Sequence, residues 1–544
     1  MKTSVGQPAI AKKLSFEDIS LELPDVFRGQ YFIESLEKEL KNLISFLNTG
    51  QLTVSSLEAL LKPFFSSLAE GIDQMILPVI THEMAIAKAI GILRGEDGKA
   101  RYESFFVDGG EYTSTARSIP LRYSCLFKMT DTVIQSTLKS ALDCLVHLMH
   151  DLSLLKESFF IEKQDVLESL DILGKSDPHL GHRTFLLRFQ SDKMVIHKSV
   201  DLSADQLYVE FLQKLELPNP YDLKNMRVIP IGHEYGWIEY IDYRECTDIQ
   251  QIKNFYRRAG VLVAVADCLN YTDGHFENLI AAGEYPILLD GETLFQNYVI
   301  PERKEYQKKN LLATSLVQKP PSGEMEMGYG AAFQAPPINH FEVVFPFVLK
   351  DQTDEIELHY RGLKDEKSHN CPAIGGKYFT IHNFIEELIE GFSFAFDHIK
   401  KQVPRILSDT EWWDRVAKVK SRTVLRETMA YCYLLRRIQR PEACISEATM
   451  KNILEAKLGN TPYTAYEIED LMRMNVPYFY QYPGERHLYQ GDGKKHPYLF
   501  LKSGIEALKE QFLNWNEEYK AHAIEILKKH LPSTPVLGEL TYYF

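Results

Sequence analysis

The stretch YTDGHFENLIAAGEYPILLDGET (residues 271–293) decides the expected fold, because a polar motif and an apolar strand follow each other within it. Asp273, His275 and Asn278 have D-x-H-x-x-N spacing in a loop after the apolar helical run FYRRAGVLVAVADCLN. The run YPILL then predicts a short strand that ends at Asp290. We therefore expect polar side chains from two nearby segments to converge.

Residue types in this order are typical of phosphoryl-transfer sites. Asp273 would orient or deprotonate an attacking hydroxyl, while Asn278 and Asp290 would hold Mg²⁺ against the phosphates of ATP. Lys198, at the end of the β-type run KMVIHK (193–198), takes the position of the lysine that holds nucleotide phosphates in kinases. The spacing also arises by chance, and each of these residues taken singly is more often a cap or a surface group.

A helix is predicted next, over SADQLYVEFLQKLEL (203–217), with Ser203 and Gln206 forming a capping box. Glu210 on this helix has two interpretations that the sequence leaves open. It would pair with Lys198 as part of the cofactor-binding site, or it would be a solvated residue on the outer face of the helix.

Composition excludes several classes of protein. At 544 residues the chain is too long for one domain, and its 45% apolar content is ordinary for a globular protein. No run approaches twenty apolar residues, so we expect no transmembrane segment. The seven cysteines form no C-x-x-C pair, which argues against structural zinc and favours a reduced, cytoplasmic protein. The net charge of −14 argues against a nucleic-acid binder.

Hydrophobic periodicity predicts helices at both ends of the chain and strands between them, which is an α+β fold. The pattern is helical from residue 16 to about 165, and again from about residue 378 onward. Between them, TFLLRF with KMVIHK, and MRVIPIG with YGWIEYI, predict two β-hairpins. The segment from about 300 to 375 is rich in Pro, Gly and Lys and predicts surface loops.

These motifs together resemble a known family, the dehydratase domain of class II (LanM-type) lanthipeptide synthetases. TDGHFENLIAAGEYPILLDGETLF is similar to its catalytic segment, and SDPHLGHRTFLLRF, MVIHKSVDL and YGWIEYI are similar to its earlier motifs. SRTVLRETMAYCYLL and EIEDLMRMNVPYF resemble two later ones, so the matches follow in order along nearly the whole chain. Such enzymes phosphorylate Ser and Thr of a leader-bearing precursor peptide with ATP and Mg²⁺. They then eliminate the phosphate, which leaves dehydroalanine or dehydrobutyrine.

The resemblance implies which residues serve the kinase step. The family's kinase residues fall on Lys198, Asp273, His275, Asn278 and Asp290, with Asn278 and Asp290 as the magnesium ligands. This chain departs from the family at two places. Its lysine lies in H-K-S-V instead of Y-K-P-R, and a glycine replaces the middle residue of D-L-E.

The resemblance also implies which residues serve elimination. Arg422 and Thr428 fall on the family's elimination residues, and Asp177 and His179 on a D-x-H pair at the same active site. A guanidinium group would bind the leaving phosphate, and His179 would be the base. Without the resemblance, Arg422 and Thr428 read as ordinary residues of one helix. Six residues separate them, so both reach one phosphate only if Arg422 extends back or the helix begins between them.

The resemblance implies a kinase-like (lipid-kinase-like) bilobal core with large N- and C-terminal helical additions. The expected regions are a helical part over 1–165, an N-lobe with β-hairpins over 166–245, a C-lobe with the catalytic loop over 246–405, and a helical part with the elimination residues over 406–544. No C-H-G motif of a zinc-dependent cyclase is present, so we expect a stand-alone dehydratase, or a fragment of one, and a separate cyclase. A kinase that acts on a peptide or small molecule without elimination, and a non-catalytic binding protein, remain as alternatives.

Overall fold

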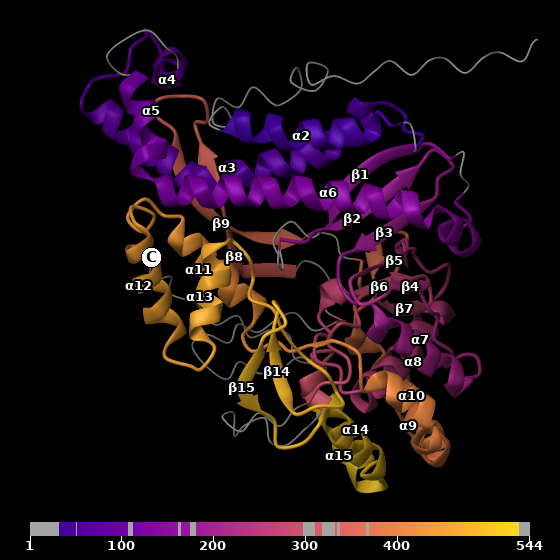
Figure 1. The fold of residues 1–544 in the computed structure, drawn as a ribbon. Helices are drawn as coiled ribbons and strands as arrows, with labels where there is room; N and C mark the ends of the chain where they lie inside the picture. The colour runs from indigo at the N-terminus through magenta and orange to yellow at the C-terminus, as the bar shows by residue number, and fades with distance from the viewer. Residues whose placement is uncertain are drawn as a thin grey trace, which may run out of the picture. The chain divides into compact units, whose positions relative to one another are not determined.

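The computed structural model describes residues 32–49, 52–106, 113–161, 165–173, 181–297, 311–317, 332–333, 338–365 and 369–531. Figure 1 shows their helices and strands along the chain. The chain divides into two compact units. Unit 1 comprises Met1–His197, Val348–Leu358 and Gln439–Met450, and unit 2 comprises Lys198–Phe347, His359–Ile438 and Lys451–Phe544.

The chain up to residue 198 consists mainly of long helices followed by strands. Its elements are α2 (Ile33–Leu47), α3 (Leu57–Ala89), α4 (Gly98–Phe106), α5 (Thr113–Arg122), α6 (Ser124–Phe159), β1 (Leu167–Leu173), β2 (Thr184–Phe189) and β3 (Met194–Lys198). The amphipathic runs at 32–47 and 132–155 therefore form helices, as their periodicity predicts. Leu138, Leu145 and Leu148 of α6, at helical spacing, are buried. No helix among the described residues is long and apolar enough to span a membrane.

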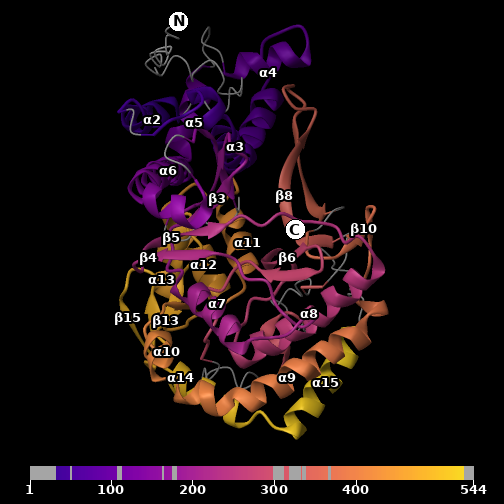
Figure 2. The same ribbon diagram turned by 90° about the vertical axis from the view of Figure 1, so that its right-hand side faces the viewer.

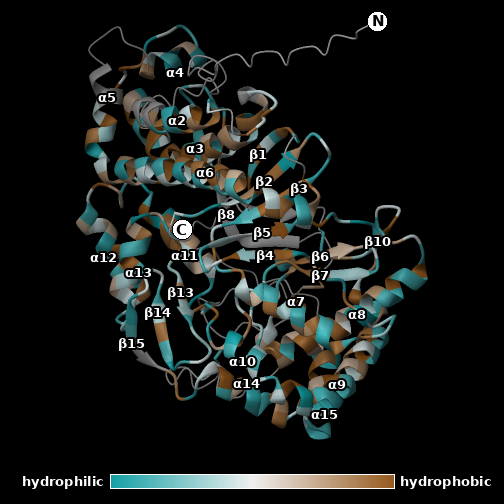
Figure 3. Ribbon diagram, turned by 45° about the vertical axis from the view of Figure 1, so that its right-hand side comes forward, coloured by the Kyte–Doolittle hydropathy of each residue, from teal (hydrophilic) through white to brown (hydrophobic). Residues whose placement is uncertain are grey.

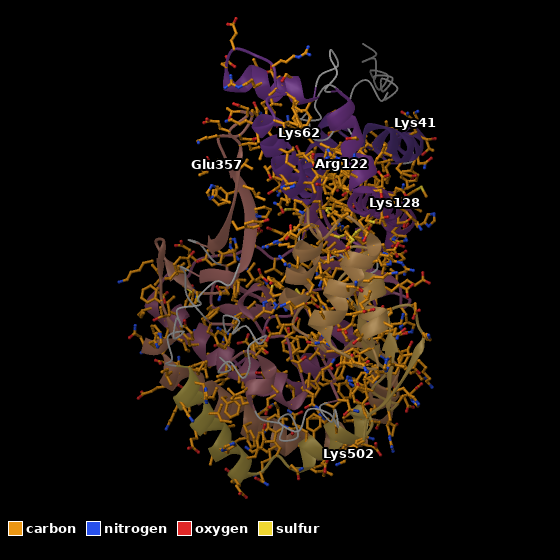
Figure 4. The ribbon with its side chains drawn as sticks, turned by 90° about the vertical axis from the view of Figure 1, so that its left-hand side faces the viewer. Lys41, Lys62, Arg122, Lys128, Glu357 and Lys502 are labelled. Atoms are coloured by element: carbon orange, nitrogen blue, oxygen red, sulfur yellow. The ribbon has the colours of Figure 1, made fainter. Side chains whose placement is uncertain are left out.

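A buried carboxylate ties α3 to the segment where α5 ends and α6 begins. Glu83 of α3 is 1% exposed, and Arg122 (labelled in Figure 4) places Nη2 2.5 Å from its Oε2. The Tyr123 hydroxyl donates a hydrogen bond to Glu83 Oε1 at 2.7 Å. Burial and this bond raise the pKa of Tyr123. Both partners are needed, because a buried charge without them would be costly.

The strands β1, β2 and β3 pair antiparallel, which confirms the first predicted hairpin. Leu187 lies opposite Val195, and Phe185 lies opposite His197. Successive side chains of a strand point to opposite faces. Val195 and His197 are therefore buried on one face, while Lys198, the last residue of β3, projects from the other.

The remaining elements continue along the chain in the following order. They are α7 (Ser203–Leu215), β4 (Val228–Ile231), β5 (Tyr235–Glu239), α8 (Ile249–Cys268), β6 (Leu279–Ala282), β7 (Tyr285–Leu288), β8 (Ile338–Leu349), β9 (Glu357–Asp365), β10 (Ala373–Ile374), β11 (Lys377–Tyr378), α9 (Ile385–Ser408), α10 (Thr410–Val416), β12 (Ser421–Arg422), α11 (Thr428–Ile438), α12 (Glu447–Leu458), α13 (Thr464–Met472), β13 (Phe479–Gln481), β14 (His487–Gln490), β15 (Lys495–Leu499), α14 (Gly504–Leu513) and α15 (Glu517–His530). The second predicted hairpin is confirmed by β4 and β5, and the strand YPILL by β7.

Three sequence predictions differ from the structure. The segment from about 300 to 375, expected as loops, contains the paired strands β8 and β9. The C-terminal part, expected to be helical, also contains the sheet β12-β13-β14-β15. The capping box is wrong, because Ser203 lies inside α7 and its N–H binds Asp201 Oδ1 at 2.9 Å. Among these strands, β12 has its partner far along the chain, because Ser421 pairs with Gln481 of β13, so local periodicity does not predict it.

In unit 2, α8 and α9 pack closely along each other, and α15 packs on α9 (Figure 2). Two glycines allow the close approach. A Cβ atom on Gly260 of α8 would lie 1.9 Å from the Leu388 carbonyl oxygen, and one on Gly391 of α9 would lie 1.8 Å from that of Arg257. Hydrophilic and hydrophobic residues both occur along α9 (Figure 3), and Phe392 on its inner face is fully buried. This packing fixes the helix that leads into the D-x-H-x-x-N loop.

We expect Gly260→Ala to destabilise unit 2, because the added methyl group would meet backbone atoms of α9 that cannot move independently. Overpacking of this kind costs about 1–3 kcal/mol or more, which would lower the midpoint of thermal unfolding by about 5 °C. Gly71→Ala is the control, because Gly71 is exposed on α3 and a Cβ there would have no neighbour within 4 Å. Equal midpoints for the two variants, measured by circular dichroism, would contradict the close packing.

Candidate active site

The loop between α8 and β6 brings the D-x-H-x-x-N residues together, as their spacing predicts. His275 precedes the short helix η2 (Phe276–Asn278), and its Nδ1 accepts a hydrogen bond from the Glu277 N–H at 3.3 Å. Asn278 Nδ2 donates to the backbone oxygen of Asp273 at 2.8 Å and to its Oδ2 at 3.2 Å. His275 Nε2 lies 3.7 Å from Asp273 Oδ1. Asn278 Nδ2 also lies 3.3 Å from His275 Nε2, so the amide nitrogen of Asn278 links the three residues of the motif.

The backbone of this loop is fixed at both of its ends. Gly274 donates its N–H to the Thr314 carbonyl oxygen at 2.9 Å, and a Cβ on Gly274 would lie 2.6 Å from the same oxygen. A glycine is therefore required between Asp273 and the histidine. The Leu289 N–H donates to the Asn278 carbonyl oxygen at 3.0 Å, which ties the loop to the end of β7.

Lys198 and Asp290 form an ion pair at the centre of the site. Lys198 Nζ lies 2.9 Å from Asp290 Oδ2, and the side chains are 16% and 26% exposed. Burial disfavours the charged lysine, but Asp290 and then Asp205 outweigh it and raise the pKa of Lys198. Burial likewise opposes the charge of Asp290, and Lys198 lowers the pKa of Asp290 below its usual value. The structure thus places the expected phosphate-binding lysine against an expected magnesium ligand.

The side chains of Arg422 and Thr428 are also in contact, although the two residues do not lie on one helix. Arg422 lies on β12 and Thr428 is the first residue of α11, so the helix begins after Arg422. Arg422 Nη2 donates to Thr428 Oγ1 at 3.3 Å, and Nη1 lies 2.5 Å from Glu292 Oε1. Burial opposes the charge of Arg422, but Glu292 and then Asp273 raise its pKa. The prediction that both residues lie on one helix is therefore wrong, and the second alternative, a helix that begins between them, is the one observed.

A second buried ion pair stabilises the segment between β12 and α11. Arg426 Nε lies 2.7 Å from Oε1 of Glu467, which is 0% exposed. The same oxygen accepts a hydrogen bond from the Tyr431 hydroxyl at 2.6 Å, and Arg426 Nη2 donates to the Leu458 carbonyl oxygen at 2.8 Å. These contacts fix the start of α11, and with it the position of Thr428.

Glu210 does not pair with Lys198, so the expected cofactor-binding role of Glu210 is wrong. Its carboxylate makes two hydrogen bonds with the guanidinium of Arg415 on α10, at 2.6 and 2.7 Å. Glu210 lies on a different face of α7 from the one directed at Lys198, and it links two helices.

Asp205, which the sequence reasoning missed, is the acid of α7 that faces the site. Its Oδ1 accepts a hydrogen bond from the Gly291 N–H at 2.7 Å. Burial, followed by the charge of Asp290, raises the pKa of Asp205 to about 7. A signal was present, because Asp205 shares the buried face of α7 with Tyr208 and Leu215 at helical spacing. A carboxylate at an apolar position of this kind needs a partner.

The oxygen donors of the site suit a magnesium ion. The side-chain oxygen of Asn278 and the carboxylate of Asp290 are the expected ligands, and Glu292 follows at D-x-E spacing, a signal that the sequence reasoning did not use. Within the described ranges, no group of three His, Cys, Asp or Glu is arranged to hold a metal alone. Mg²⁺ commonly binds one or two protein carboxylates and completes its shell with waters and substrate phosphates, so the donor set fits.

The charges of the site fit a divalent cation as well. Its acids are Asp205, Asp273, Asp290 and Glu292, and the cations that interact with them are Lys198 and Arg422. Acidic groups in excess at a partly buried site favour an additional positive charge. Burial raises the pKa of Glu292 although Arg422 opposes this. Asp177 and His179 lie outside the described residues.

Comparisons with known proteins agree with these motifs. The family model described as "Domain of unknown function (DUF4135)" matches residues 123–482, which is more than half of the chain and includes every site residue named above. The lacticin 481/lactococcin biosynthesis protein LcnDR2 of Lactococcus lactis subsp. lactis is 24% identical over 479 residues. That alignment covers 81% of this chain and 49% of the relative, so the chain spans about half the length of the curated protein that it matches. The chain belongs to the DUF4135 family, the domain found in the LanM-type lanthipeptide synthetases that its motifs resemble.

Proposed function

We propose that this protein is a lanthipeptide dehydratase, which phosphorylates Ser or Thr of a precursor peptide with ATP and then eliminates the phosphate. One observation carries the proposal. The segment Asp290–Glu292 binds Lys198 with its first residue and Arg422 with its last, so the groups for both half-reactions meet at three consecutive residues. The relative's printed role in lacticin 481 and lactococcin biosynthesis supports a peptide substrate of this kind.

We also propose a kinase-like, bilobal arrangement for the core. The hairpin that ends at Lys198, the helix α7, the loop with Asp273 and the strand that leads to Asp290 follow in the order that kinases use. The precursor peptide would carry a leader, and a separate cyclase would close any thioether rings.

In the first half-reaction, the peptide hydroxyl attacks the terminal phosphorus of ATP. Asp273 accepts the hydroxyl proton, and the oxygen–phosphorus bond forms as the bond to ADP breaks. Lys198 binds phosphate oxygens and stabilises their charge. Asn278 and Asp290 would hold Mg²⁺, which neutralises charge on the phosphates when it is bound. His275, 3.7 Å from Asp273, orients that carboxylate.

In the second half-reaction, a base removes the α-proton of the phosphorylated residue. The electron pair of the broken C–H bond forms the double bond between the α- and β-carbons. The bond from the β-carbon to oxygen breaks, and phosphate leaves with the electron pair of that C–O bond. Arg422 binds the leaving dianion through its guanidinium group, and Thr428 donates a hydrogen bond from its hydroxyl. His179 is the proposed base, with Asp177 beside it.

One observation favours the alternative of a kinase without elimination. Arg422 is already neutralised by Glu292, with 2.5 Å between Nη1 and Oε1, so the guanidinium is engaged before any phosphate arrives. A dehydratase requires that the phosphate displace Glu292. Mass spectrometry of the treated peptide separates the two functions, since elimination gives a net loss of water and a kinase leaves the phosphate in place.

Asp290→Asn is expected to abolish both phosphorylation and dehydration, because the substitution removes a magnesium ligand and the partner of Lys198. The rate of peptide modification, measured by mass spectrometry with ATP and Mg²⁺, should fall at least about 100-fold. Asp414→Asn is the control, because Asp414 is an exposed acid of α10 in the same unit. Near wild-type modification by the Asp290 variant would mean that the site is elsewhere.

Lys198→Ala should raise the KM for ATP and lower kcat, because a fixed cation at the phosphates is lost from a partly buried site. Lys193→Ala is the matched control, because Lys193 is exposed at the other end of the same hairpin. Steady-state kinetics with varied ATP measures both constants. If Lys193→Ala causes the loss and Lys198→Ala does not, the phosphate-binding lysine has been assigned wrongly.

Arg422→Ala and Thr428→Ala are expected to accumulate peptide that carries phosphate, with little dehydrated product. Both groups act on the leaving phosphate, while the kinase step depends on Lys198 and Asp273. Arg473→Ala, which removes an exposed arginine whose ion pair is with the exposed Glu469, four residues earlier, controls for loss of charge. Loss of phosphorylation itself in the Arg422 variant would place this residue in the nucleotide or peptide site.

A further inference from the structure

Gly291 separates the two acids of the active site, and its backbone is held by a side chain from α7. The buried Gly291 N–H donates to Oδ1 of Asp205 at 2.7 Å, and Asp205 is itself 4% exposed. A buried N–H group needs an acceptor, and losing it costs about 1–3 kcal/mol. This hydrogen bond therefore fixes the orientation of the peptide bond between Asp290 and Gly291.

The contact depends on the absence of a side chain at residue 291. A Cβ atom there would lie 2.8 Å from Asp205 Oδ1 and 3.0 Å from its Cγ, closer than van der Waals contact allows. The φ angle of Gly291 is outside the left-handed region, so its backbone conformation alone would tolerate alanine. The close approach of Asp205 is what requires glycine at this position.

The fixed peptide bond lies between two side chains with different partners. Asp290 Oδ2 binds Lys198 Nζ at 2.9 Å, while Glu292 Oε1 binds Arg422 Nη1 at 2.5 Å. The Asp290 carboxylate also accepts the Glu292 N–H at 3.1 Å, which makes the segment a tight turn. Rotation of the central peptide would move both carboxylates away from their cations at once.

We propose that Asp205 is a positioning residue for both half-reactions, because its bond to the Gly291 N–H directs Asp290 toward Lys198 and Glu292 toward Arg422, whose guanidinium Glu292 holds in place until the phosphate displaces it. The inference rests on the proposed function and adds a residue shared by its two steps. The required property of Asp205 is its hydrogen-bond acceptor. Its negative charge is not required, because Asp290, 2.9 Å from Lys198 Nζ, contributes more than Asp205 to keeping that lysine charged.

The test uses the full chain, a Ser-containing lanthipeptide precursor with its leader, and two separate assays. Phosphorylation is followed on the unmodified peptide with Mg²⁺ and ATP, and elimination on the same peptide made with phosphoserine, without ATP. Asp205→Ala is expected to slow both by about tenfold or more, because small displacements of catalytic groups have effects of this size. Asp205→Asn keeps the acceptor and should restore both rates, with an unchanged midpoint of thermal unfolding.

Gly291→Ala provides a second route that removes no hydrogen-bonding group. Its methyl group must push Asp205 away, so it should slow both assays as Asp205→Ala does. In the Asp205→Ala background, Gly291→Ala should add little further loss, because the closest atoms that it would meet, Oδ1 and Cγ of Asp205, are gone. The remaining neighbour, Leu294 Cδ1 at 3.0 Å, is the end of a side chain that can rotate away. This variant carries the test if Asp205→Ala is unfolded at the assay temperature.

Each other outcome contradicts a defined statement. An Asp205→Asn variant as slow as Asp205→Ala would mean that the charge acts, and loss in only one assay would mean that the segment does not serve both steps. Wild-type rates in Asp205→Ala, beside an active wild type, would overturn this inference alone. A wild type inactive in both assays would overturn the proposed function, and the inference with it.

Discussion

Asp290 and Glu292, two residues apart, bind cations that come from distant parts of the chain, Lys198 at the end of β3 and Arg422 on β12. Burying four charged groups in one place is costly unless each has a partner at short distance. The ion pairs meet that requirement, and they leave the site with more acids than cations. Lys198, α7 and the sheet with β12 have to converge on this segment for the charges to be satisfied.

Under the proposed function, a substrate has to displace one partner of each of these ion pairs in order to bind. A nucleotide with its metal competes with Lys198 for Asp290, and a phosphorylated peptide competes with Glu292 for Arg422. The metal ion carries two positive charges and the phosphorylated peptide carries a dianion. In a partly buried site, each attracts its partner more strongly than a single ammonium or carboxylate group does. Under the proposed function, the phosphate groups of the reaction would replace these two ion pairs one after the other.

Close packing of the helices and loops around the site holds these charged groups in position. Gly260 lets α8 approach α9 at backbone distance, and Gly274 lets the catalytic loop approach Thr314. The pair of Arg426 with the buried Glu467 holds the first turn of α11. Helices and loops positioned by backbone contact and buried ion pairs move less than those held by exposed side chains, which is what convergent catalytic groups require.

The sequence by itself determined the local elements and the motif residues. The hairpin ending at Lys198, the helices α7 and α8 and the strand before Asp290 follow from hydrophobic periodicity, because that period is set by the local backbone geometry. The loop spacing likewise predicted that Asp273 and Asn278 would meet. Only the tertiary structure decided which charges pair. Glu210 and Asp205 lie on the same helix. The sequence of that helix does not predict that Glu210 binds Arg415 or that Asp205 accepts the Gly291 N–H. The strand β12 was missed for the same reason, since its partner β13 lies far along the chain, with Ser421 opposite Gln481.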